Sequence, residues 1–209
     1  MLQKNIKQVI ISLISELDFY FVENGFLRRS NSLTYIRKLD GVTQKVEIVF
    51  FSNPSYHPCA LAHIYPHMQI YIPSVNGTTK EYASHLITSK WLDQFTIRQP
   101  IQIYSSSGNF YLMDINACES LKDQLLDFFE KNAIPLLNDI ISEKDYLSLY
   151  ENKDKRIIWD DHQYLYIAAT YLNKHDLNKA TEVIENRFGK KGLRKKYNEV
   201  IKYFENLEE

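Results

Sequence analysis

The chain has 209 residues, 44% hydrophobic and 24% charged, and these ordinary globular proportions exclude a disordered or fibrous protein. Its 25 basic and 26 acidic side chains leave a net charge of -1, so no overall positive field favours nucleic acid or an anionic membrane. Two cysteines, Cys59 and Cys118, are too few for a disulfide framework. We therefore expect a cytoplasmic protein.

Apolar residues at three- and four-residue spacing predict one amphipathic helix over residues 2-24, which Gly25 caps. Glu16 and Asp18 follow the apolar stretch without a small-residue cleavage site, which favours a helix of the mature chain over a signal peptide. No apolar run approaches the roughly 18 residues that a transmembrane helix needs. We expect no membrane partner.

The dipeptide Asp40-Gly41 lies between two apolar runs and predicts a β-hairpin with a type I′ turn, in which both residues have positive φ. Its strands should cover 31-39 and 43-52. The predicted register places three apolar pairs on one face: Leu39 with Val42, Tyr35 with Val46, and Leu33 with Ile48. A third extended segment, 60-72, contains Pro66, which predicts an edge strand or a local break.

Further along the chain, capping residues and periodicity predict mostly helices. A capping box at Thr78 and Glu81 should open a helix that runs to about Phe95. A second hairpin is expected over 101-115, with its turn at 105-109. The later helices are predicted to start at Asn116, Ser142, Asp160 or Asp161, Asp176 and residue 192, with an interruption at Pro135.

Taken together, these elements predict an α+β fold. We expect an antiparallel sheet of about five strands, with the 2-24 and 78-95 helices against one face. The predicted domains are an α+β domain over 1-150 and a helical C-terminal subdomain over 151-209, packed on the first.

Motifs for chemistry are few. The six glycines fall mostly at expected caps and turns, which leaves no phosphate-binding loop, and the common nucleophile and zinc motifs are missing from the sequence. Ser84-His85 is the nearest adjacent nucleophile and base, but adjacency does not define such a pair, and we favour a structural helix position. The basic run 190-196 is interpreted as a solvated helix start. No cofactor, metal or nucleic acid is predicted.

The segment Ile48 to Thr79 is unusual because its 32 residues contain no Asp, Glu, Lys or Arg, yet include three of the six histidines. In an extended chain its apolar residues alternate with an uncharged aromatic and polar stripe. The stripe consists of His63, Tyr65, His67, Gln69 and Tyr71.

Three interpretations of this stripe remain open. It is a second buried surface if helices cover it, or a partner-binding surface, since Tyr-rich surfaces poor in charge are typical of interface cores. The third is a metal site from His57, Cys59, His63 and His67. However, His63 and His67 would lie about 13 Å apart along a strand, too far to share one ion.

The order of elements resembles a bacterial group of domains of unknown function, some of which resemble immunity proteins of polymorphic and contact-dependent toxin systems. The resemblance covers roughly residues 5 to 150 and carries over no catalytic residue. The residues that carry it are Asn24-Gly25-Phe26-Leu27-Arg28-Arg29, the hairpin with Tyr35 and Val46 to Phe51, Ile64 to His67, Leu125 to Lys131, and Ile134-Pro135-Leu136-Leu137.

This resemblance implies a cytosolic immunity protein, not an enzyme, that neutralises a cognate toxin by occlusion. The partner would be a protein, and the stripe its binding surface. Two alternatives stay open: a hydrolytic enzyme that uses the histidine-rich segment 57-67, and a non-enzymatic adaptor or regulator.

Overall fold

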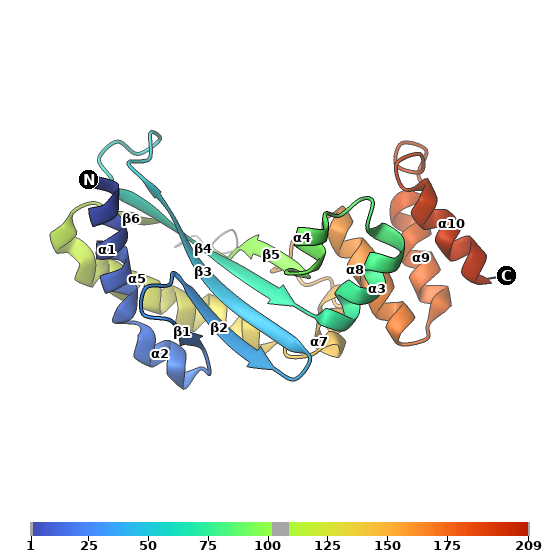
Figure 1. Ribbon diagram of the computed structural model, residues 1–209, viewed down its shortest axis with the longest axis horizontal. Coiled ribbons are helices and arrows are strands. Elements are labelled where there is room, and N and C mark those ends of the chain that lie inside the picture. The colour runs from blue at the N-terminus through green and yellow to red at the C-terminus, as the bar shows by residue number, and fades with distance from the viewer. Residues whose placement is uncertain (1, 102–108, 209) are drawn as a thin grey trace. The chain divides into compact units, whose positions relative to one another are not determined.

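The computed structural model describes residues 2-101 and 109-208 (Figure 1). Its helices and antiparallel sheet confirm the α+β class. Cα packing groups the residues into two compact units: unit 1 is Met1–Leu39, Thr43–Gln69 and Arg98–Asp139, and unit 2 is Asp40–Val42, Ile70–Ile97 and Ile140–Glu209. Each unit is described by itself. The division into a 1-150 domain and a 151-209 subdomain stays a prediction.

The sheet has six strands in the order β1-β2-β3-β4-β5, with β6 also paired to β4. In the β1-β2 pair Arg28 lies opposite Tyr35. The strands are β1 (Leu27–Arg28), β2 (Thr34–Leu39), β3 (Val42–Ser52), β4 (Ala62–Tyr71), β5 (Ile97–Pro100) and β6 (Phe110–Leu112). The turn predicted at 105-109 lies almost wholly outside the described residues.

The predicted hairpin is confirmed, but its turn type is wrong. The Ile48 N–H donates to the Leu33 carbonyl (2.7 Å), which is the predicted register. Gly41 has a φ of +72°, whereas Asp40 does not have a positive φ. A type I′ turn requires both, so this connection is a different two-residue turn in which only the glycine is left-handed.

The conformation of Gly41 gives a stability prediction. Gly41→Ala should lower the free energy of unfolding by about 1 kcal/mol, because a left-handed φ is costly for a residue with a Cβ, although the added atom meets nothing within 4 Å. Gly77 also has open space around it but lies in a helix, so Gly77→Ala should raise that energy by about 0.5 to 1 kcal/mol. Urea unfolding of both variants checks the opposite signs, and equal signs would contradict the turn geometry.

Pro66 predicts an edge strand or a local break, and the first alternative is wrong, since β4 lies between β3 and β5. One stretch of β4, Ala62 to Ile64, pairs with β6. Further along, the Ile70 carbonyl accepts from the Thr96 N–H (2.7 Å). Pro66 falls between these two stretches, so its missing N–H interrupts neither of them.

The helix predicted over 2-24 is two helices, α1 (Leu2–Ser15) and α2 (Asp18–Glu23). Between them the N–H groups of Glu16 and Leu17 donate to carbonyls three residues back. The Ser15 hydroxyl also donates to the Ile11 carbonyl (2.7 Å), a bond that weakens the helix locally. The bend therefore has a local cause that apolar periodicity does not show.

The end of α2 confirms the predicted glycine cap. Gly25 has a φ of +80°. Its N–H donates to the Val22 carbonyl (2.9 Å), and the Phe26 N–H donates to the Phe21 carbonyl (2.8 Å). This is a Schellman motif. The Phe26 ring then meets the edge of Phe21 at 5.8 Å between centroids, which fixes the chain where it enters β1.

Helices of unit 1 cover one face of the sheet. Phe21 of α2 stacks on Tyr35 of β2 at 3.8 Å, and Phe110 of β6 meets Phe128 at 5.2 Å. The buried Gln44 of β3 donates to the Leu137 carbonyl (2.7 Å). The covering helices include η2 (Ile115–Ala117), α5 (Cys118–Phe128), a π-helical turn η3 (Phe129–Ala133) and α6 (Ile134–Asn138).

The helix start predicted at Asn116 and the interruption predicted at Pro135 both need correction. Asp114, not Asn116, caps the first turn, because its carboxylate accepts from the Asn116 N–H (3.1 Å). Pro135 lies in the first turn of α6, directly after the wide π turn η3. Proline lacks the N–H for the preceding helical bond, and the helical path continues through it.

In unit 2 the helix predicted over 78-95 is two helices, α3 (Pro73–Ala83) and α4 (Ser89–Leu92), and the capping box is wrong. Pro73 occupies the first turn of α3. The buried Asn76 explains the earlier start, since its amide donates to the carbonyls of Leu92 (2.7 Å) and Phe95 (2.8 Å) and its oxygen accepts from Thr96.

The remaining helices of unit 2 begin largely where the capping residues predict. Side chains of Ser142, Asp160 and Asp176 each accept a backbone N–H at the start of a helix. The last helix starts later than residue 192, after the basic run 190-196. The helices are α7 (Glu143–Glu151), α8 (Asp161–Asn173), α9 (Leu177–Phe188) and α10 (Asn198–Glu208). Among the described residues, no helix has the length and apolarity to cross a membrane.

Candidate functional site

The predicted stripe lies on the face of β4 opposite the core. Alternate residues of β4 are completely buried, as Ile64 and Met68 are at 0% exposure. Their neighbours Tyr65 and His67 are half-buried, and His63 and Gln69 are buried at 7% and 6% exposure. The alternation predicted from the sequence is thus present, and the exposed fraction varies along the stripe.

The structure brings four of the five stripe residues together within unit 1: His63, Tyr65, His67 and Gln69. The fifth residue, Tyr71, is half-buried at the end of β4 and belongs to unit 2. The role of Tyr71 as a partner-binding residue stays a prediction.

His63 is the centre of a cluster of rings. Its cross-strand partner is Tyr111 of β6, and their rings stack at 4.5 Å between centroids. His57, from the segment between β3 and β4, stacks on the same tyrosine at 4.3 Å. Tyr111 therefore joins two histidines that are separated by six positions in the sequence.

The cluster continues along both neighbouring strands. Tyr65 lies edge-on to His63 (5.5 Å) and to His67 (5.4 Å), and Phe51 of β3 lies against Tyr65 at 6.3 Å. The Tyr56 hydroxyl is hydrogen-bonded to Nδ1 of His63 (2.7 Å). We call this set the aromatic face: Phe51, Tyr56, His57, His63, Tyr65, His67 and Tyr111.

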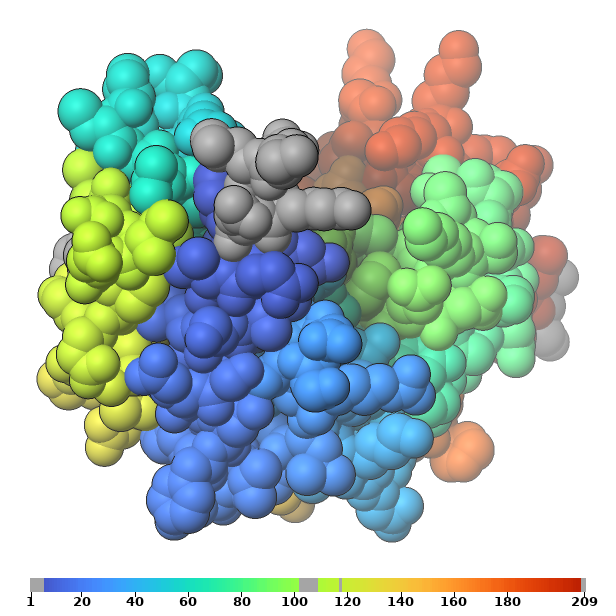
Figure 2. All heavy atoms as spheres, turned by 60° about the vertical axis from the view of Figure 1, so that its left-hand side comes forward, coloured from blue at the N-terminus to red at the C-terminus, as the bar shows by residue number. Residues whose placement is uncertain are grey.

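Part of the aromatic face is open to solvent. Phe51 is 51% exposed and Tyr56 is 62% exposed. The segment between β3 and β4, which carries Tyr56 and His57, extends beyond the ends of these two strands (Figure 1), and its cyan atoms form a projection at the upper left of Figure 2. Large exposed rings of this kind are surface that a partner can bury.

Burial favours the neutral form of two histidines of the face, His63 and His67. Burial, with the nearby His57, lowers the pKa of His63 below its ordinary value. Burial and the charge of Arg98 lower the pKa of His67, and Glu47 opposes this shift. The imidazoles of His63 and His67 are therefore mainly uncharged near pH 7.

Three ring nitrogens of the face are buried without a hydrogen-bond partner among the described residues: Nδ1 of His57, Nε2 of His63 and Nδ1 of His67. An unsatisfied buried polar atom costs about 1 to 3 kcal/mol. Such atoms are rare in parts of a protein that serve stability alone. Their concentration on one face marks this region as a candidate site.

A polar group borders the face. The Gln69 amide donates to Glu47 of β3 (2.5 Å), and Arg98 of β5 lies 3.4 Å from the same carboxylate. An uncharged aromatic centre with a charged border is the usual composition of a protein interface.

The residues considered for a metal site do not converge. Cys59 is exposed, and His57 and His63 lie on Tyr111 rather than on each other. In the part of the chain that the structure describes, no three His, Cys, Asp or Glu side chains are placed to hold one ion. The expectation of no bound metal stays a prediction.

The other two motifs lie in unit 2. Ser84 and His85 are exposed at the end of α3, and His85 lies 3.5 Å from Glu199. In the basic run, Arg194 pairs with Glu185 and Glu205, both at 3.3 Å. Ser84 and His85 thus show no bond between a nucleophile and a base among the described contacts, whereas the lysines of the basic run are exposed, and the absence of a nucleic-acid partner stays a prediction.

Sequence reasoning misses three members of the aromatic face: Phe51, Tyr56 and Tyr111. Phe51 lies on the same face of β3 as the polar residues Lys45 and Glu47, because these residues alternate along the strand. This alternation is visible in the sequence and could have identified Phe51. Tyr111 is far from β4 in the sequence and joins the face only through β6 pairing.

Comparison of the chain with known protein families, with curated proteins and with solved structures finds no match.

Proposed function

We propose that this chain is a cytosolic immunity protein that binds a toxin and neutralises it by covering it, without turnover. The observation that carries the proposal is the aromatic face, a neutral ring cluster with two exposed rings on the sheet face opposite the helix-covered core. Tyrosine and other aromatic side chains carry much of the binding energy in protein interfaces. The resemblance of the N-terminal elements to immunity proteins supplies the class of partner.

The proposal fits binding better than catalysis because of how the face uses its polar groups. The His63 imidazole is hydrogen-bonded to the Tyr56 hydroxyl and stacked on the Tyr111 ring. These two contacts restrict the orientation of the imidazole. Among residues 2-101 and 109-208, no serine or cysteine nucleophile is bonded to it, and a general base must reach the group that it deprotonates. His63 and His67 therefore act as contact rings and not as a general base.

Site-specific photo-crosslinking in the producing bacterium tests the proposal. A photoreactive phenylalanine at position 56 should capture a protein, whereas the same residue at position 19 should not, since Phe19 is 73% exposed but lies outside the aromatic face. The captured protein, expressed alone, should stop growth, and co-expression of this chain should restore it. Equal capture at both positions, or a captured protein that is harmless, would contradict the proposal.

A further inference from the structure

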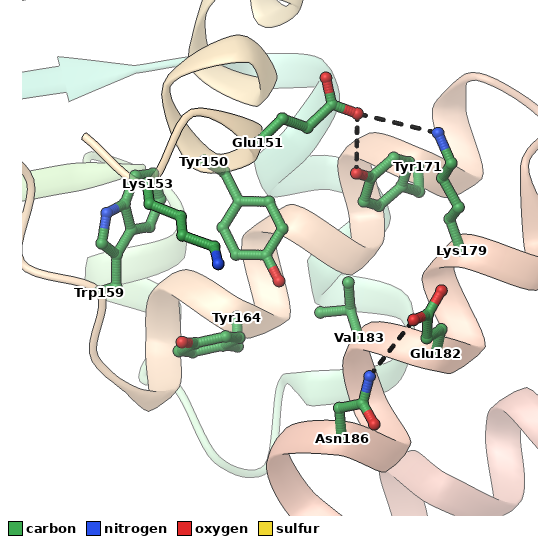
Figure 3. Close-up of a pocket in the computed structure, with 10 residues that line it drawn as sticks. All are labelled: Tyr150, Glu151, Lys153, Trp159, Tyr164, Tyr171, Lys179, Glu182, Val183 and Asn186. Carbon is green, nitrogen blue, oxygen red and sulfur yellow. Dashed lines mark hydrogen bonds and ion pairs between the residues drawn. The ribbon is translucent and has the colours of Figure 1, made fainter.

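Unit 2 contains a pocket that the proposed function does not use. It lies between the end of α7, the 153-159 segment, α8 and α9, and has a volume of about 520 Å³ (Figure 3). This volume is within the range of small-molecule sites, about 300 to 1,000 Å³. Tyr150, Lys153, Trp159, Tyr164, Glu182 and Val183 are the lining residues used below.

Three aromatic rings form a corner of this pocket. Tyr150 is edge-on to Trp159 (5.4 Å, 73°) and nearly perpendicular to Tyr164 (5.9 Å, 88°). Figure 3 shows Tyr150 between Lys153 and Val183, with Tyr164 nearby. Rings at right angles leave ring faces and edges available to a planar apolar group.

The walls are held in place before any ligand binds. The Trp159 indole donates to the Asp154 carbonyl (2.8 Å). The Arg187 guanidinium lies 4.7 Å from the Tyr164 ring centre, and Asp161 holds that guanidinium through two hydrogen bonds. Fixed walls reduce the entropy lost on binding.

The charges of the pocket identify the ligand. Glu151 and Lys179 lie 3.8 Å apart, and the Tyr171 hydroxyl donates to Glu151 (3.0 Å). Lys153, by contrast, has neither an ion pair nor a side-chain hydrogen bond among the described residues, and its ammonium points toward the aromatic corner (Figure 3). Among the described residues, the pocket thus presents one unpaired cation, Lys153, beside an aromatic wall, and one carboxylate without a cation partner, Glu182.

The backbone fixes the position of Lys153. Its φ is +54°, which is uncommon for a residue with a side chain, and its N–H donates to the Tyr150 carbonyl (2.9 Å). The backbone therefore fixes the point, just after α7, from which the Lys153 side chain extends. A cation in such a position is suited to meet a carboxylate by a charge-assisted hydrogen bond.

We propose that this pocket binds a small aromatic carboxylic acid, with its ring in the corner formed by Tyr150, Trp159 and Tyr164 and its carboxylate on Lys153. The Tyr150 hydroxyl, which has no hydrogen-bond partner among the described residues, is a second donor to the carboxylate. Burial raises the pKa of Tyr150, so this hydroxyl stays protonated. On the opposite side of the pocket the Glu182 carboxylate accepts from Asn186 (3.5 Å), so the negative charge of the ligand is expected to lie on the Lys153 side.

The test uses indole-3-acetate and its neutral analogue indole-3-acetamide as probes for the full chain. Calorimetry should detect binding of the acid and at least about tenfold weaker binding of the amide, because only the acid can pair with Lys153. In nitrogen-proton NMR spectra the Trp159 indole signal should shift, while that of Trp91, which does not line the pocket, should not. Phe substitution of Trp91 assigns the two signals.

The matched variants are Lys153→Met and Lys155→Met, which remove one exposed ammonium each from the same segment. Lys153→Met should weaken binding of the acid at least about tenfold, and Lys155→Met should not change it. Thermal melts establish that both variants are folded. Absence of acid binding at millimolar concentration, equal affinity for acid and amide, or an unchanged affinity in Lys153→Met would each overturn the proposal.

Discussion

Asp18→Ala should lower the free energy of unfolding by about 2 to 3 kcal/mol, because it leaves a buried guanidinium without its counter-ion. The Arg28 side chain is 2% exposed and makes two bonds to Asp18, from Nε (2.8 Å) and from Nη2 (2.7 Å). The Tyr35 hydroxyl donates to the same carboxylate (2.7 Å). The Asp18 side chain is itself 42% exposed. The expected loss of unfolding free energy is therefore smaller than the roughly 3 to 5 kcal/mol that breaking a fully buried ion pair costs.

The rest of the Arg28 guanidinium is also occupied, which makes its position rigid. Nη1 donates to the carbonyls of Ser30 (2.8 Å) and Ser32 (3.0 Å). Arg28 therefore cannot turn to water when Asp18 is removed without breaking these bonds. Urea unfolding at pH 7 measures the loss.

Two control variants separate the effect of leaving Arg28 unpaired from the general effect of removing a carboxylate. Asp123→Ala removes an exposed carboxylate of α5 and should change stability by no more than about 0.5 kcal/mol. The double variant Asp18→Ala with Arg28→Met removes both charges and should recover part of the loss. An Asp18→Ala protein as stable as the Asp123→Ala protein would show that the pair contributes little.

The same pair gives a pH dependence. Burial raises the pKa of Asp18, but the hydrogen bonds from Arg28 and Tyr35 and the charge of Arg28 outweigh it, so the pKa is below its ordinary value. The stabilisation is therefore complete above the unfolded-state pKa of about 4, and is lost as the pH falls through the lower, folded-state pKa. Asp18→Asn should make the free energy of unfolding depend less on pH in this acidic range. The pKa values of Asp154 and Asp161 are lowered as well, so part of the loss should persist in the variant.

Local signals in the sequence predict much of the fold. The Schellman cap at Gly25 and the caps at Ser142, Asp160 and Asp176 depend on residues a few positions apart, and all four are confirmed. The failures have long-range causes. Asn76 lies in α3 because Leu92, Phe95 and Thr96 bond its side chain, and no pattern around residue 76 indicates these partners.

The candidate site was predictable only in part for the same reason. Parity along β4 identifies which side chains share a face, and His63, Tyr65 and His67 do lie together. Parity cannot identify what the neighbouring strands add, such as Tyr111 of β6. The pocket of unit 2 was not predicted at all, because packing of separate helices brings its rings together.

If the proposed function holds, Tyr65→Ala should weaken binding of the partner captured at position 56 at least about thirtyfold, which corresponds to about 2 kcal/mol, because Tyr65 lies in the middle of the aromatic face. Its ring contacts His63, His67 and Phe51. The side chain is only half-buried, so the variant should lose no more than about 1 kcal/mol of stability. Binding to the crosslinked partner and survival of cells that express it measure the first effect, and urea unfolding measures the second.

Two reference variants make the result decisive. Phe19→Ala removes a ring that is 73% exposed outside the aromatic face, and it should leave both binding and stability unchanged. Phe110→Ala removes a ring that is 0% exposed in the core of unit 1, and it should lower the free energy of unfolding by about 3 to 5 kcal/mol. If Tyr65→Ala behaves like Phe110→Ala, and protection fails only in proportion to unfolding, the stripe is a second buried surface. If it behaves like Phe19→Ala, the aromatic face is not where the toxin binds. Loss of binding with stability retained distinguishes an interface from both, because a contact made only in the complex leaves the free protein unchanged.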